Sequence, residues 1–419
     1  MNRRDFLVNS TVALGGCAIL SGCDNKKLIK EEGKITKRKF KGIEIPLLGF
    51  GCMRLPMTKD GKKVDMVELD KMVEYAMNHG ANYFDTAYMY VDSQSESAMG
   101  EVLKKYPRES FILADKSPIY KMKTQDDIRK IFDEQRKKCQ VEYFDFYMAH
   151  NINKNTYQTY KDTKMHEQLL ELKKEGKIKY VGFSFHGTPD ILKEVVAEGN
   201  WDFCQLQINY LDWDVVKGKE QYEIAHNAGI PVTVMEPLRG GGLVNLSDKA
   251  LKELKENYPE TTPAAFGLRW AASLDDVVTV LSGMSNLEQM KENIETFENF
   301  IPMTEDEKTT ALKIAKIIQS QGEINCTACK YCLEVCPKDI NIPAIFALYN
   351  QYKVEKNDYM FTVYYETLPE EERAEECIKC GLCTKNCPQG LQIPELLEKA
   401  IHEYEKIKAM RKNFVLKNL

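Results

Sequence analysis

Short apolar or β-branched runs alternate with segments of helical period through the central part of this chain. The runs are PLLGFGC (46–52), NYFDTA (82–87), FILADK (111–116), YFDFYMAH (143–150), YVGFSFH (180–186), FCQLQIN (203–209), PVTVMEP (231–237) and VVTVLSG (277–283). Each run has the length and composition of a buried strand. The pattern therefore predicts eight strands.

The segments between the runs have the periodicity of amphipathic helices. The clearest is DMVELDKMVEYAMNHG (65–80), in which one face carries Met66, Leu69, Met72, Val73 and Ala76. Asp65 is placed to cap this helix, with Glu68 three residues later, and Gly80 is placed to end it. The chain therefore alternates strand and helix.

This alternation predicts the fold class. Strands separated by helices pair in parallel, and eight units spread over roughly 240 residues fit one closed barrel. We predict an α/β fold, a (β/α)8 TIM barrel, with a doubly wound open sheet as the alternative. Ahead of the first strand, KRKFKGIEI (37–45) is expected to form a small hairpin that plugs the N-terminal end of the barrel.

The charge balance and the positions of the cysteines exclude some classes of protein. The 58 basic and 63 acidic side chains leave a net charge of −5, so nothing indicates a nucleic-acid partner. Eight of the thirteen cysteines fall in two C-terminal boxes. The cysteine content is therefore a local feature and not that of a disulfide-stapled fold.

The N-terminus resembles an export signal. Arg3 and Arg4 precede a modest apolar stretch, VALGGCAIL (12–20), which is too short to span a membrane as a helix. This stretch leads into LSGC, which ends at Cys23. These features are typical of a twin-arginine signal with a lipoprotein box. We expect export to the periplasm or cell envelope and a lipid anchor on Cys23 as the membrane attachment. Cys17 is a weaker alternative, and fortuitous arginines at a cytosolic N-terminus are the other reading.

The cysteine boxes share one unusual spacing. CTACKYCLEVCP (326–337) and CIKCGLCTKNCP (377–388) both read C-x2-C-x2-C-x3-C-P. This spacing is specific for two 4Fe-4S clusters in which the fourth cysteine of each box ligates the other cluster. The predicted ligand sets are Cys326, Cys329, Cys332 and Cys387 for one cluster, and Cys377, Cys380, Cys383 and Cys336 for the other. Zinc sites or disulfides are the alternatives.

Four segments follow from these patterns. Residues 1–23 form the predicted signal and 24–34 a charged linker. Residues 35–303 form the barrel, and 304–419 form a C-terminal domain that carries both cysteine boxes. The sequence between the boxes has helical composition and is longer than a compact bacterial ferredoxin uses, so an α-helical ferredoxin-like domain is expected.

Polar residues cluster where the predicted strands end, which is where chemistry resides in barrels of this kind. These positions hold Asp85, Lys116, His150, Ser184, His186, Gln205, Asn209, Met235 and Glu236. FDTAYMY, ADKSP and YMAHN together resemble the aldo-keto reductases, over roughly residues 35 to 300. The resemblance implies a catalytic tetrad of Asp85, Tyr90, Lys116 and His150. Tyr90 is preferred to Tyr88 because the family's tyrosine stands five positions after the aspartate.

These four residue types suit carbonyl reduction. Hydride addition to a carbonyl leaves an alkoxide that needs a proton, and a phenol of pKa near 10 donates poorly unless its anion is stabilised. We expect Lys116 to lower the pKa of Tyr90, Asp85 to hold Lys116, and His150 to orient the carbonyl oxygen.

The resemblance also implies a nucleotide site. Its candidates are Gln205 for the nicotinamide carboxamide, with Ser184 and Asn209 nearby, Met235 for the ring face, with a core methionine as the alternative, Arg239, Gly240 and Gly241 for the diphosphate, and Gly283 after the last strand. Family members that prefer NADP carry basic residues after the last strand, whereas this chain has Gly283, Met284, Ser285 and Gln289. NADP preference is therefore doubtful, and NAD or a flavin is open.

Two functions are consistent with these features. The first is an oxidoreductase that transfers hydride between a bound NAD(P) and a small carbonyl or alcohol, and exchanges electrons with a partner protein through two 4Fe-4S clusters. Because hydride carries two electrons and a cluster accepts one, a flavin or similar mediator is implied. The second is an electron-transfer or interaction module whose barrel is non-catalytic or holds a flavin.

Overall fold

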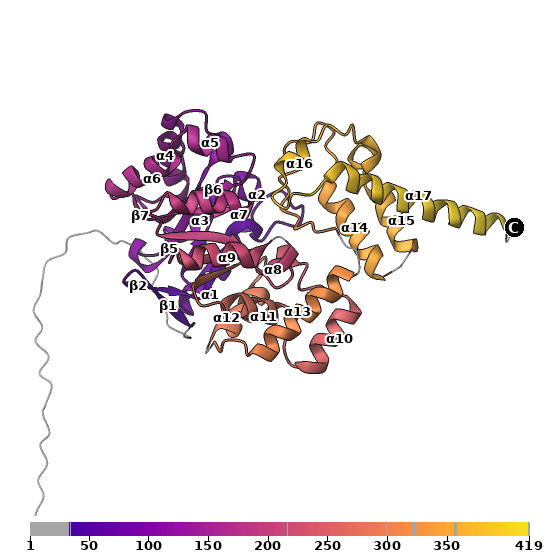
Figure 1. Ribbon diagram of the computed structural model, residues 1–419, viewed down its shortest axis with the longest axis horizontal. Helices are drawn as coiled ribbons and strands as arrows, with labels where there is room; N and C mark the ends of the chain where they lie inside the picture. Colours follow the sequence, from indigo (N-terminus) through magenta and orange to yellow (C-terminus); the bar gives the residue numbers. More distant parts are fainter. Residues whose placement is uncertain are drawn as a thin grey trace, which may run out of the picture.

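The computed structural model describes residue 33 and residues 35–215, 217–298, 300–320, 324–355 and 358–417. The predicted signal, with Cys17 and Cys23, and nearly all of the predicted linker lie outside the described residues. The rest forms a barrel and a helical C-terminal domain beside it (Figure 1).

Eight parallel strands close into a barrel, in the order β10-β3-β4-β5-β6-β7-β8-β9. They are β3 (Leu48–Gly51), β4 (Tyr83–Asp85), β5 (Ile112–Pro118), β6 (Phe144–Ile152), β7 (Ile178–Phe185), β8 (Phe203–Gln207), β9 (Val232–Met235) and β10 (Val277–Ser282). The last strand closes the circle by pairing with the first, Val280 opposite Leu48. The predicted closed barrel is confirmed, and the open sheet is excluded.

Helices surround the barrel. The longer ones are α1 (Met66–Asn78), α3 (Ser95–Leu103), α4 (Gln125–Cys139), α6 (Met165–Lys174), α7 (Pro189–Ala197), α9 (Gly218–Asn227), α10 (Asp248–Asn257), α11 (Pro263–Ala272) and α12 (Leu287–Phe297). Shorter turns are α2 (Tyr90–Ser93), α5 (Tyr157–Asp162), α8 (Asp212–Val215), and the 3-10 helices η1 (Cys52–Arg54), η2 (Arg108–Ser110), η3 (Ile119–Lys121) and η4 (Arg239–Gly241).

The N-terminal cap and the buried apolar face predicted for α1 are both observed, with one exception on that face. The Asp65 side chain accepts hydrogen bonds from the backbone N–H groups of Val67 and Glu68, both at 3.1 Å. The predicted apolar face is buried except for Met66, which is 37% exposed. Met66 is the first residue of the helix, so its side chain lies beyond the part that the barrel covers.

The predicted N-terminal hairpin is present. β1 (Lys37–Phe40) and β2 (Ile43–Pro46) pair antiparallel. The Phe40 ring packs on Phe146 and Tyr180, with centroid distances of 5.3 and 4.9 Å, so the hairpin covers one end of the barrel interior. The opposite end is left for the site.

The C-terminal domain is built from helices. It contains α14 (Ile342–Glu355), α15 (Asp358–Thr367), η5 (Glu370–Glu372), η6 (Ala374–Glu376), α16 (Leu382–Asn386) and α17 (Ile393–Lys417), and no strand in its described part. Its own apolar core includes Phe346, Tyr349, Phe361 and Tyr365. In Figure 1 the α16 side of this domain faces the barrel.

One helix that follows the predicted boundary at residue 303 packs on the barrel and not on the C-terminal domain. α13 (Glu305–Ser320) packs Ala311, Ile314 and Ala315 into the barrel core and not into the C-terminal core. Its buried positions recur at helical spacing on one face, which is the face the barrel covers.

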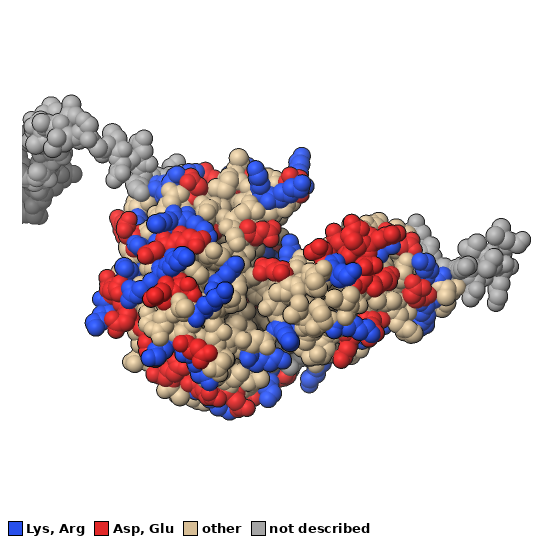
Figure 2. All heavy atoms as spheres, turned by 90° about the horizontal axis from the view of Figure 1, so that it is seen from above, with Lys and Arg blue, Asp and Glu red and all other residues tan. Residues whose placement is uncertain are grey.

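The surface carries charges of both signs. Figure 2 shows Lys and Arg interspersed with Asp and Glu over the barrel, and acidic side chains gathered on one part of the C-terminal domain. Among the described residues, no helix combines the length and the apolar character needed to cross a bilayer.

Candidate active site

A cavity of about 430 Å³, which we call the main cavity, lies at the carboxyl ends of the barrel strands. Its floor includes Asp85, Tyr90, His150, Ser184 and Gln205. Its roof comes from the C-terminal domain, through Thr327, Cys329, Tyr331 and Pro388. The two domains therefore enclose one site together.

Asp85 and Lys116 form a buried ion pair below this cavity. Lys116, on β5, brings its Nζ to 2.5 Å from Asp85 Oδ1 and donates to the carbonyl of Thr86 at 2.7 Å. The second Asp85 oxygen accepts a hydrogen bond of 3.0 Å from Gln205 Nε2 on β8. Asp85 thus positions both Lys116 and Gln205.

Tyr90 and His150 meet beside this pair. The Lys116 ammonium lies 4.7 Å from the Tyr90 ring centroid, and the Tyr90 and His150 rings lie 6.1 Å apart, nearly perpendicular. Among the described residues, neither His150 Nδ1 nor Gln205 Oε1 has a hydrogen-bond partner although both are buried. Buried polar atoms are normally paired, so these two are available for a ligand.

The lowering of the Tyr90 pKa that was expected from Lys116 is outweighed in this structure. Burial, and then the Asp85 carboxylate, hold the pKa of Tyr90 well above 10. The Lys116 charge is paired with Asp85 and faces the Tyr90 ring, so it does not outweigh burial. Tyr90 therefore carries its proton at neutral pH.

His150 is neutral at the same pH. Burial lowers its pKa well below 6.5, and the charge of Lys116 and the neighbouring His186 act in the same direction. A neutral imidazole can donate a hydrogen bond to a carbonyl oxygen from one ring nitrogen. Tyr90 and His150 thus offer two uncharged donors at one end of the cavity.

The chain that follows Tyr90 is strained. Val91, Asp92 and Ser93 all have left-handed backbones, with φ of 55°, 51° and 63°. Each such residue costs of order 1 kcal/mol or more, and this conformation persists only where neighbouring structure imposes it. Such strain is typical of functional sites.

The predicted nucleotide contacts divide into two groups. Ser184, Gln205, Met235, Gly240, Gly241 and Gly283 line the cavity. Asn209 and Arg239 do not, because Asp212 holds them: Asn209 Nδ2 donates to it at 2.8 Å and Arg239 Nε lies 3.0 Å from its other oxygen. These two side chains therefore hold the chain around the glycine loop and do not line the cavity.

Arg54 is a site residue that the sequence analysis did not identify. It follows the first barrel strand, in η1, and its Nη2 donates to the carbonyl of Thr327 in the roof at 2.9 Å. Among the described residues that line the cavity, it is the only Lys or Arg. Its position just after the end of the first barrel strand is the sequence signal that could have identified it as a site residue.

The end of the cavity next to α12 is polar and carries a carboxylate. Glu292 of α12 lines it and accepts a 2.6 Å hydrogen bond from Thr262. Gln289 lines it as well, with its Oε1 accepting from the backbone of Ser285 at 2.8 Å. This end suits a sugar diol better than a phosphate.

Glu236 lies between the barrel and the roof. It follows β9 with a left-handed backbone, φ 53°, and its side chain lines the main cavity. Burial, and then the charge of Asp212, raise its pKa to about 7.

The eight cysteines of the boxes surround two further cavities. Cys326, Cys329, Cys332 and Cys387 line one, and Cys336, Cys377, Cys380 and Cys383 line the other. Each set takes its fourth member from the other box, in keeping with the predicted crossover. In the described part of the chain every cysteine is a free thiol, and no group of three or more His, Cys, Asp or Glu is compact enough for a single metal ion.

Four thiols around a cavity are the donor set that a 4Fe-4S cluster requires, because each sulfur binds a different iron. The residues present therefore fit two such clusters. Cys329 lines both the cavity of the first cysteine set and the main cavity, which Asp85, Tyr90 and His150 also line.

Comparison with known proteins agrees with this architecture. Residues 47–316 match the aldo/keto reductase family, and residues 325–392 match a 4Fe-4S dicluster domain. A probable aldo-keto reductase of Glycine max is 27% identical over 291 residues, 60% of this chain and 81% of that protein. The NADH-specific methylglyoxal reductase of Escherichia coli is 26% identical over 269 residues, 54% of this chain and 81% of that protein.

A solved structure gives the same result. The holo form of an aldo-keto reductase from Bacillus halodurans superposes with a TM-score of 0.57 at 26% identity, covering 67% of this chain and 96% of that one.

Proposed function

The chain belongs to the aldo/keto reductase family, and from this premise we propose that it is an NAD(H)-dependent oxidoreductase that interconverts a carbonyl and an alcohol and carries two 4Fe-4S clusters. The observation that carries this proposal is the meeting of Asp85, Tyr90, Lys116 and His150 beside a cavity that is also lined by the Gly240 and Gly241 loop and by Gly283 after the last strand.

The tetrad residues have distinct roles in this proposal. A bound nicotinamide supplies or accepts the hydride. Tyr90 gives its phenolic proton to the carbonyl oxygen, and neutral His150 donates a hydrogen bond that orients that oxygen. Lys116, held by Asp85, lies close enough to stabilise the phenolate left behind. The roof residues line the same cavity as these atoms, which would limit the access of water to them.

NAD is proposed in preference to NADP. Ser184 and Gln205 are proposed for the carboxamide, Met235 for the ring, and Arg54 with Gly240 and Gly241 for the diphosphate. Glu292, at the α12 end of the cavity, would repel a 2′-phosphate and accept hydrogen bonds from a 2′-hydroxyl. The E. coli relative is named as NADH-specific, which supports the same preference.

A second candidate rests on the position of Cys329. This predicted cluster ligand borders the same cavity as Tyr90, which favours electron exchange between the first cluster and a molecule bound there. Hydride transfer moves two electrons together and a 4Fe-4S cluster exchanges one, so such exchange requires a flavin or another one-electron mediator. In this version the barrel holds a flavin and the protein serves electron transfer with a partner protein.

Tyr90→Phe tests the first candidate, with Tyr88→Phe as the matched control, because the Tyr88 hydroxyl donates to Glu134 and does not line the cavity. NADH oxidation by methylglyoxal is measured on anaerobically purified protein. Tyr90→Phe should lower kcat about 10²-fold or more, while Tyr88→Phe retains activity. Equal activity of the two variants would refute this mechanism. Release of a flavin on denaturation would favour the second candidate.

Export remains part of the proposal. We propose that the twin-arginine route carries the folded, cluster-loaded protein with its nucleotide retained, and that Cys23 is lipidated. Cell fractionation of an Arg3→Lys/Arg4→Lys variant and fatty-acid labelling of Cys23→Ala test this. Unchanged location and unchanged labelling would contradict it.

A further inference from the structure

A buried polar cluster lies between β5 and the helices α3 and α4, on the helix side of the barrel wall. Its members are fully buried and come from four elements: Glu96 on α3, Asp115 on β5, Gln135 on α4 and Tyr147 on β6. None of these four residues lines the main cavity. The cluster nevertheless touches the strand that carries Lys116 and the helix that follows Tyr90.

The Gln135 side chain is the centre of this cluster. Its Nε2 lies 2.8 Å from Glu96 Oε1, 3.0 Å from Asp115 Oδ1 and 3.0 Å from the carbonyl oxygen of Lys116. Its Oε1 accepts a hydrogen bond of 2.5 Å from the Tyr147 hydroxyl. The opposite orientation of the amide would place an oxygen against three acceptors, so these contacts define which atom is the nitrogen.

Two of the contacts in this cluster hold the backbone of Lys116. β4 ends at Asp85, which pairs with Ala114, so Lys116 lies beyond the last pair of β4 and β5. Asp115 Oδ1 accepts a hydrogen bond of 2.8 Å from the Lys116 backbone N–H, and Gln135 donates to the Lys116 carbonyl. Side chains thus supply hydrogen bonds of the kind that a neighbouring strand makes elsewhere in the sheet.

A third contact reaches the chain that follows Tyr90. α3 begins shortly after the left-handed residues 91–93. Glu96, in the first turn of α3, accepts from the same Gln135 nitrogen that holds the Lys116 carbonyl. One amide group therefore joins the first turn of α3 to the strand of Lys116.

We propose that Gln135 is a positioning residue that sets the distance between Lys116 and Tyr90. This rests on the proposed function, in which Lys116 stabilises the phenolate that Tyr90 leaves when it gives up its proton. The Lys116 ammonium lies 4.7 Å from the Tyr90 ring centroid, and the stabilisation of a charge falls with distance. Without the Gln135 amide, β5 and the first turn of α3 can move apart, so proton transfer slows although no residue of the cavity has changed.

The titratable groups around Gln135 come from every neighbouring element: Glu96 from α3, Asp115 and Lys116 from β5, Tyr147 from β6, and Lys138 and Cys139 from α4. Lys138 Nζ lies 3.2 Å from Glu96 Oε2, and Cys139 Sγ lies 3.8 Å from Asp115 Oδ2. Burial raises the pKa of Glu96, and burial and then the charge of Glu96 raise the pKa of Asp115 well above 3.8. A third carboxyl at position 135 meets the same surroundings, so its pKa should also lie above that of an ordinary glutamate.

Gln135→Met keeps the length of the side chain and removes its hydrogen bonds. In the reduction of methylglyoxal by NADH, measured on cluster-loaded protein, this variant should lower kcat about tenfold and leave the Kd of NADH unchanged within about twofold. The solvent deuterium isotope effect on kcat should rise from about 1 to about 2, because proton transfer from Tyr90 becomes rate-limiting.

Gln135→Glu tests the same contacts through a pH profile. At about pH 5.5 a protonated carboxyl can donate to the Lys116 carbonyl and accept from Tyr147, so kcat should stay close to the wild-type value. As the pH rises to about 8.5 the carboxyl ionises and loses its donor, and kcat relative to wild type should fall to the level of Gln135→Met. A loss of packing alone gives no such dependence on pH.

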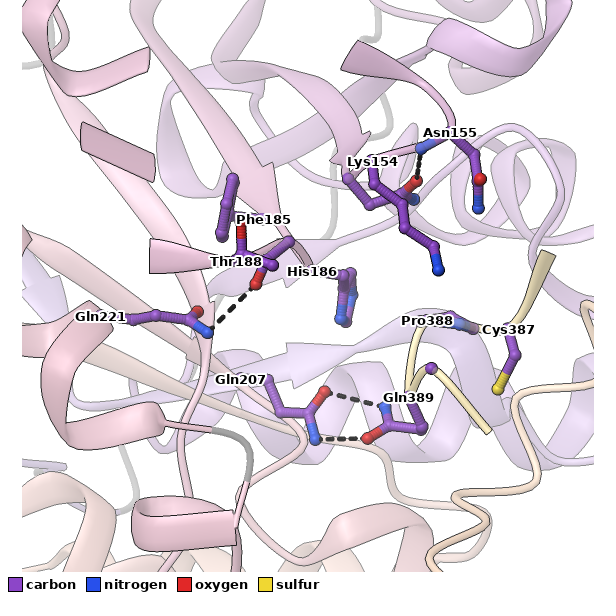
Figure 3. A pocket seen from close by; sticks show the side chains of 13 residues that line it. Lys154, Asn155, Phe185, His186, Thr188, Gln207, Gln221, Cys387, Pro388 and Gln389 are labelled. Carbon is purple, nitrogen blue, oxygen red and sulfur yellow. Dashed lines mark hydrogen bonds between the residues drawn. The ribbon is translucent and has the colours of Figure 1, made fainter. Parts of the chain in front are cut away.

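Two variants control for the loss of a glutamine. Gln140→Met, at the end of the same helix, removes a hydrogen bond of 2.6 Å to Glu101 of α3, and within the described part of the chain the Gln140 side chain has no hydrogen bond to β5. Gln207→Met removes a buried amide that bonds Asp212 and Gln389 (Figure 3). Neither variant should change the solvent isotope effect.

A kcat and an isotope effect in Gln135→Met equal to those of the wild type would overturn the proposal. If Gln135→Met does not fold, the pH profile of Gln135→Glu decides, and a profile parallel to that of the wild type overturns it. A wild type without reductase activity contradicts the proposed function instead. Amide hydrogen exchange at Lys116 then tests the link itself: it should be faster in Gln135→Met than in Gln140→Met, and equal rates would refute the link.

Discussion

The carboxamides of Gln207 and Gln389 are joined by two hydrogen bonds, of 2.9 and 2.8 Å, across 182 positions of sequence. A second link joins Arg54 to the carbonyl of Thr327 at 2.9 Å. Both links end on chain segments that carry cysteines of the first set. The position of the roof is therefore set at the same loops that are proposed to hold the first cluster.

Gly240→Ala should loosen this roof. Gly240 has φ of 64°, and a Cβ at this position would lie 2.2 Å from the carbonyl oxygen of Thr327. The roof must move to admit the methyl group, so the clusters should lose visible absorbance several-fold faster in air, and NADH should bind more weakly. Anaerobic transfer to aerated buffer with spectroscopic monitoring measures the first effect.

Gly241→Ala is the control for backbone strain. Gly241 also has a left-handed backbone, φ 95°, but a Cβ there meets no atom within 4 Å. Both variants carry the conformational cost of order 1 kcal/mol, and only Gly240→Ala adds the clash. Identical cluster lifetimes in the two variants would show that the Thr327 contact does not protect the first cysteine set.

Lys116→Met should affect stability and activity together. Removing one member of a buried ion pair leaves Asp85 charged and uncompensated, which costs about 3 kcal/mol or more in the free energy of unfolding. It also removes the cation next to the Tyr90 ring, so kcat/KM for carbonyl reduction should fall about 10²-fold or more. Thermal unfolding and steady-state kinetics measure the two losses.

The double variant Asp85→Asn/Lys116→Met separates these losses. With both charges gone, most of the lost stability should return, because no unpaired charge remains buried. Activity should stay low, since the cation is still missing. Recovery of activity in the double variant would contradict the role proposed for Lys116.

The barrel and the tetrad were predictable because their signals are local. Each strand run is a short apolar segment, and barrel closure brings the strand ends to one rim, so Asp85, Lys116 and His150 were expected to meet. The cysteine sets were predictable for a similar reason, because the spacing within each box is itself the signal.

The roof was not predictable because it depends on contacts between distant segments. Nothing local to Tyr331 or Pro388 indicates that they line the cavity above Tyr90. Likewise, Arg239 was assigned to the diphosphate by its place in a glycine loop, but its ion pair with Asp212 turns the guanidinium away. Whether a side chain lines the cavity is therefore decided by its contacts in the folded protein and not by its spacing in the sequence.

His150 should make the folded protein sensitive to acid. Burial lowers its pKa in the folded state well below 6.5, so below pH 6.5 the unfolded chain binds a proton that the folded chain does not. This contribution to stability is complete above pH 6.5 and is lost as the pH falls. From pH 7.5 to 5.5 the wild type should lose about 1.4 kcal/mol more stability than His150→Asn.

Anaerobic chemical denaturation at the two pH values measures this difference. An equal loss in wild type and variant would mean that His150 is charged, or freely solvated, in the folded protein. Between pH 7 and 9, His150 stays neutral and Tyr90 stays protonated. Titration of these two residues should therefore not change the kcat/KM of the wild type over that range.

Serine variants of the cysteines should group by cavity and not by sequence box. Cys387 lines one cavity with Cys326, and Cys336 lines the other with Cys377. Cys387→Ser should therefore leave the same residual electron paramagnetic resonance spectrum as Cys326→Ser, and Cys336→Ser the same as Cys377→Ser, each with about half of the iron.

The first pair should also disturb the active site more than the second. Cys387 is followed directly by Pro388, which lines the main cavity, whereas the cavity around Cys336 shares no residue with the main cavity. NADH affinity should thus fall in Cys387→Ser and persist in Cys336→Ser. Cys204→Ala, in the barrel core, should retain all of the iron. Spectra that group Cys387→Ser with Cys377→Ser would refute the crossover between the boxes.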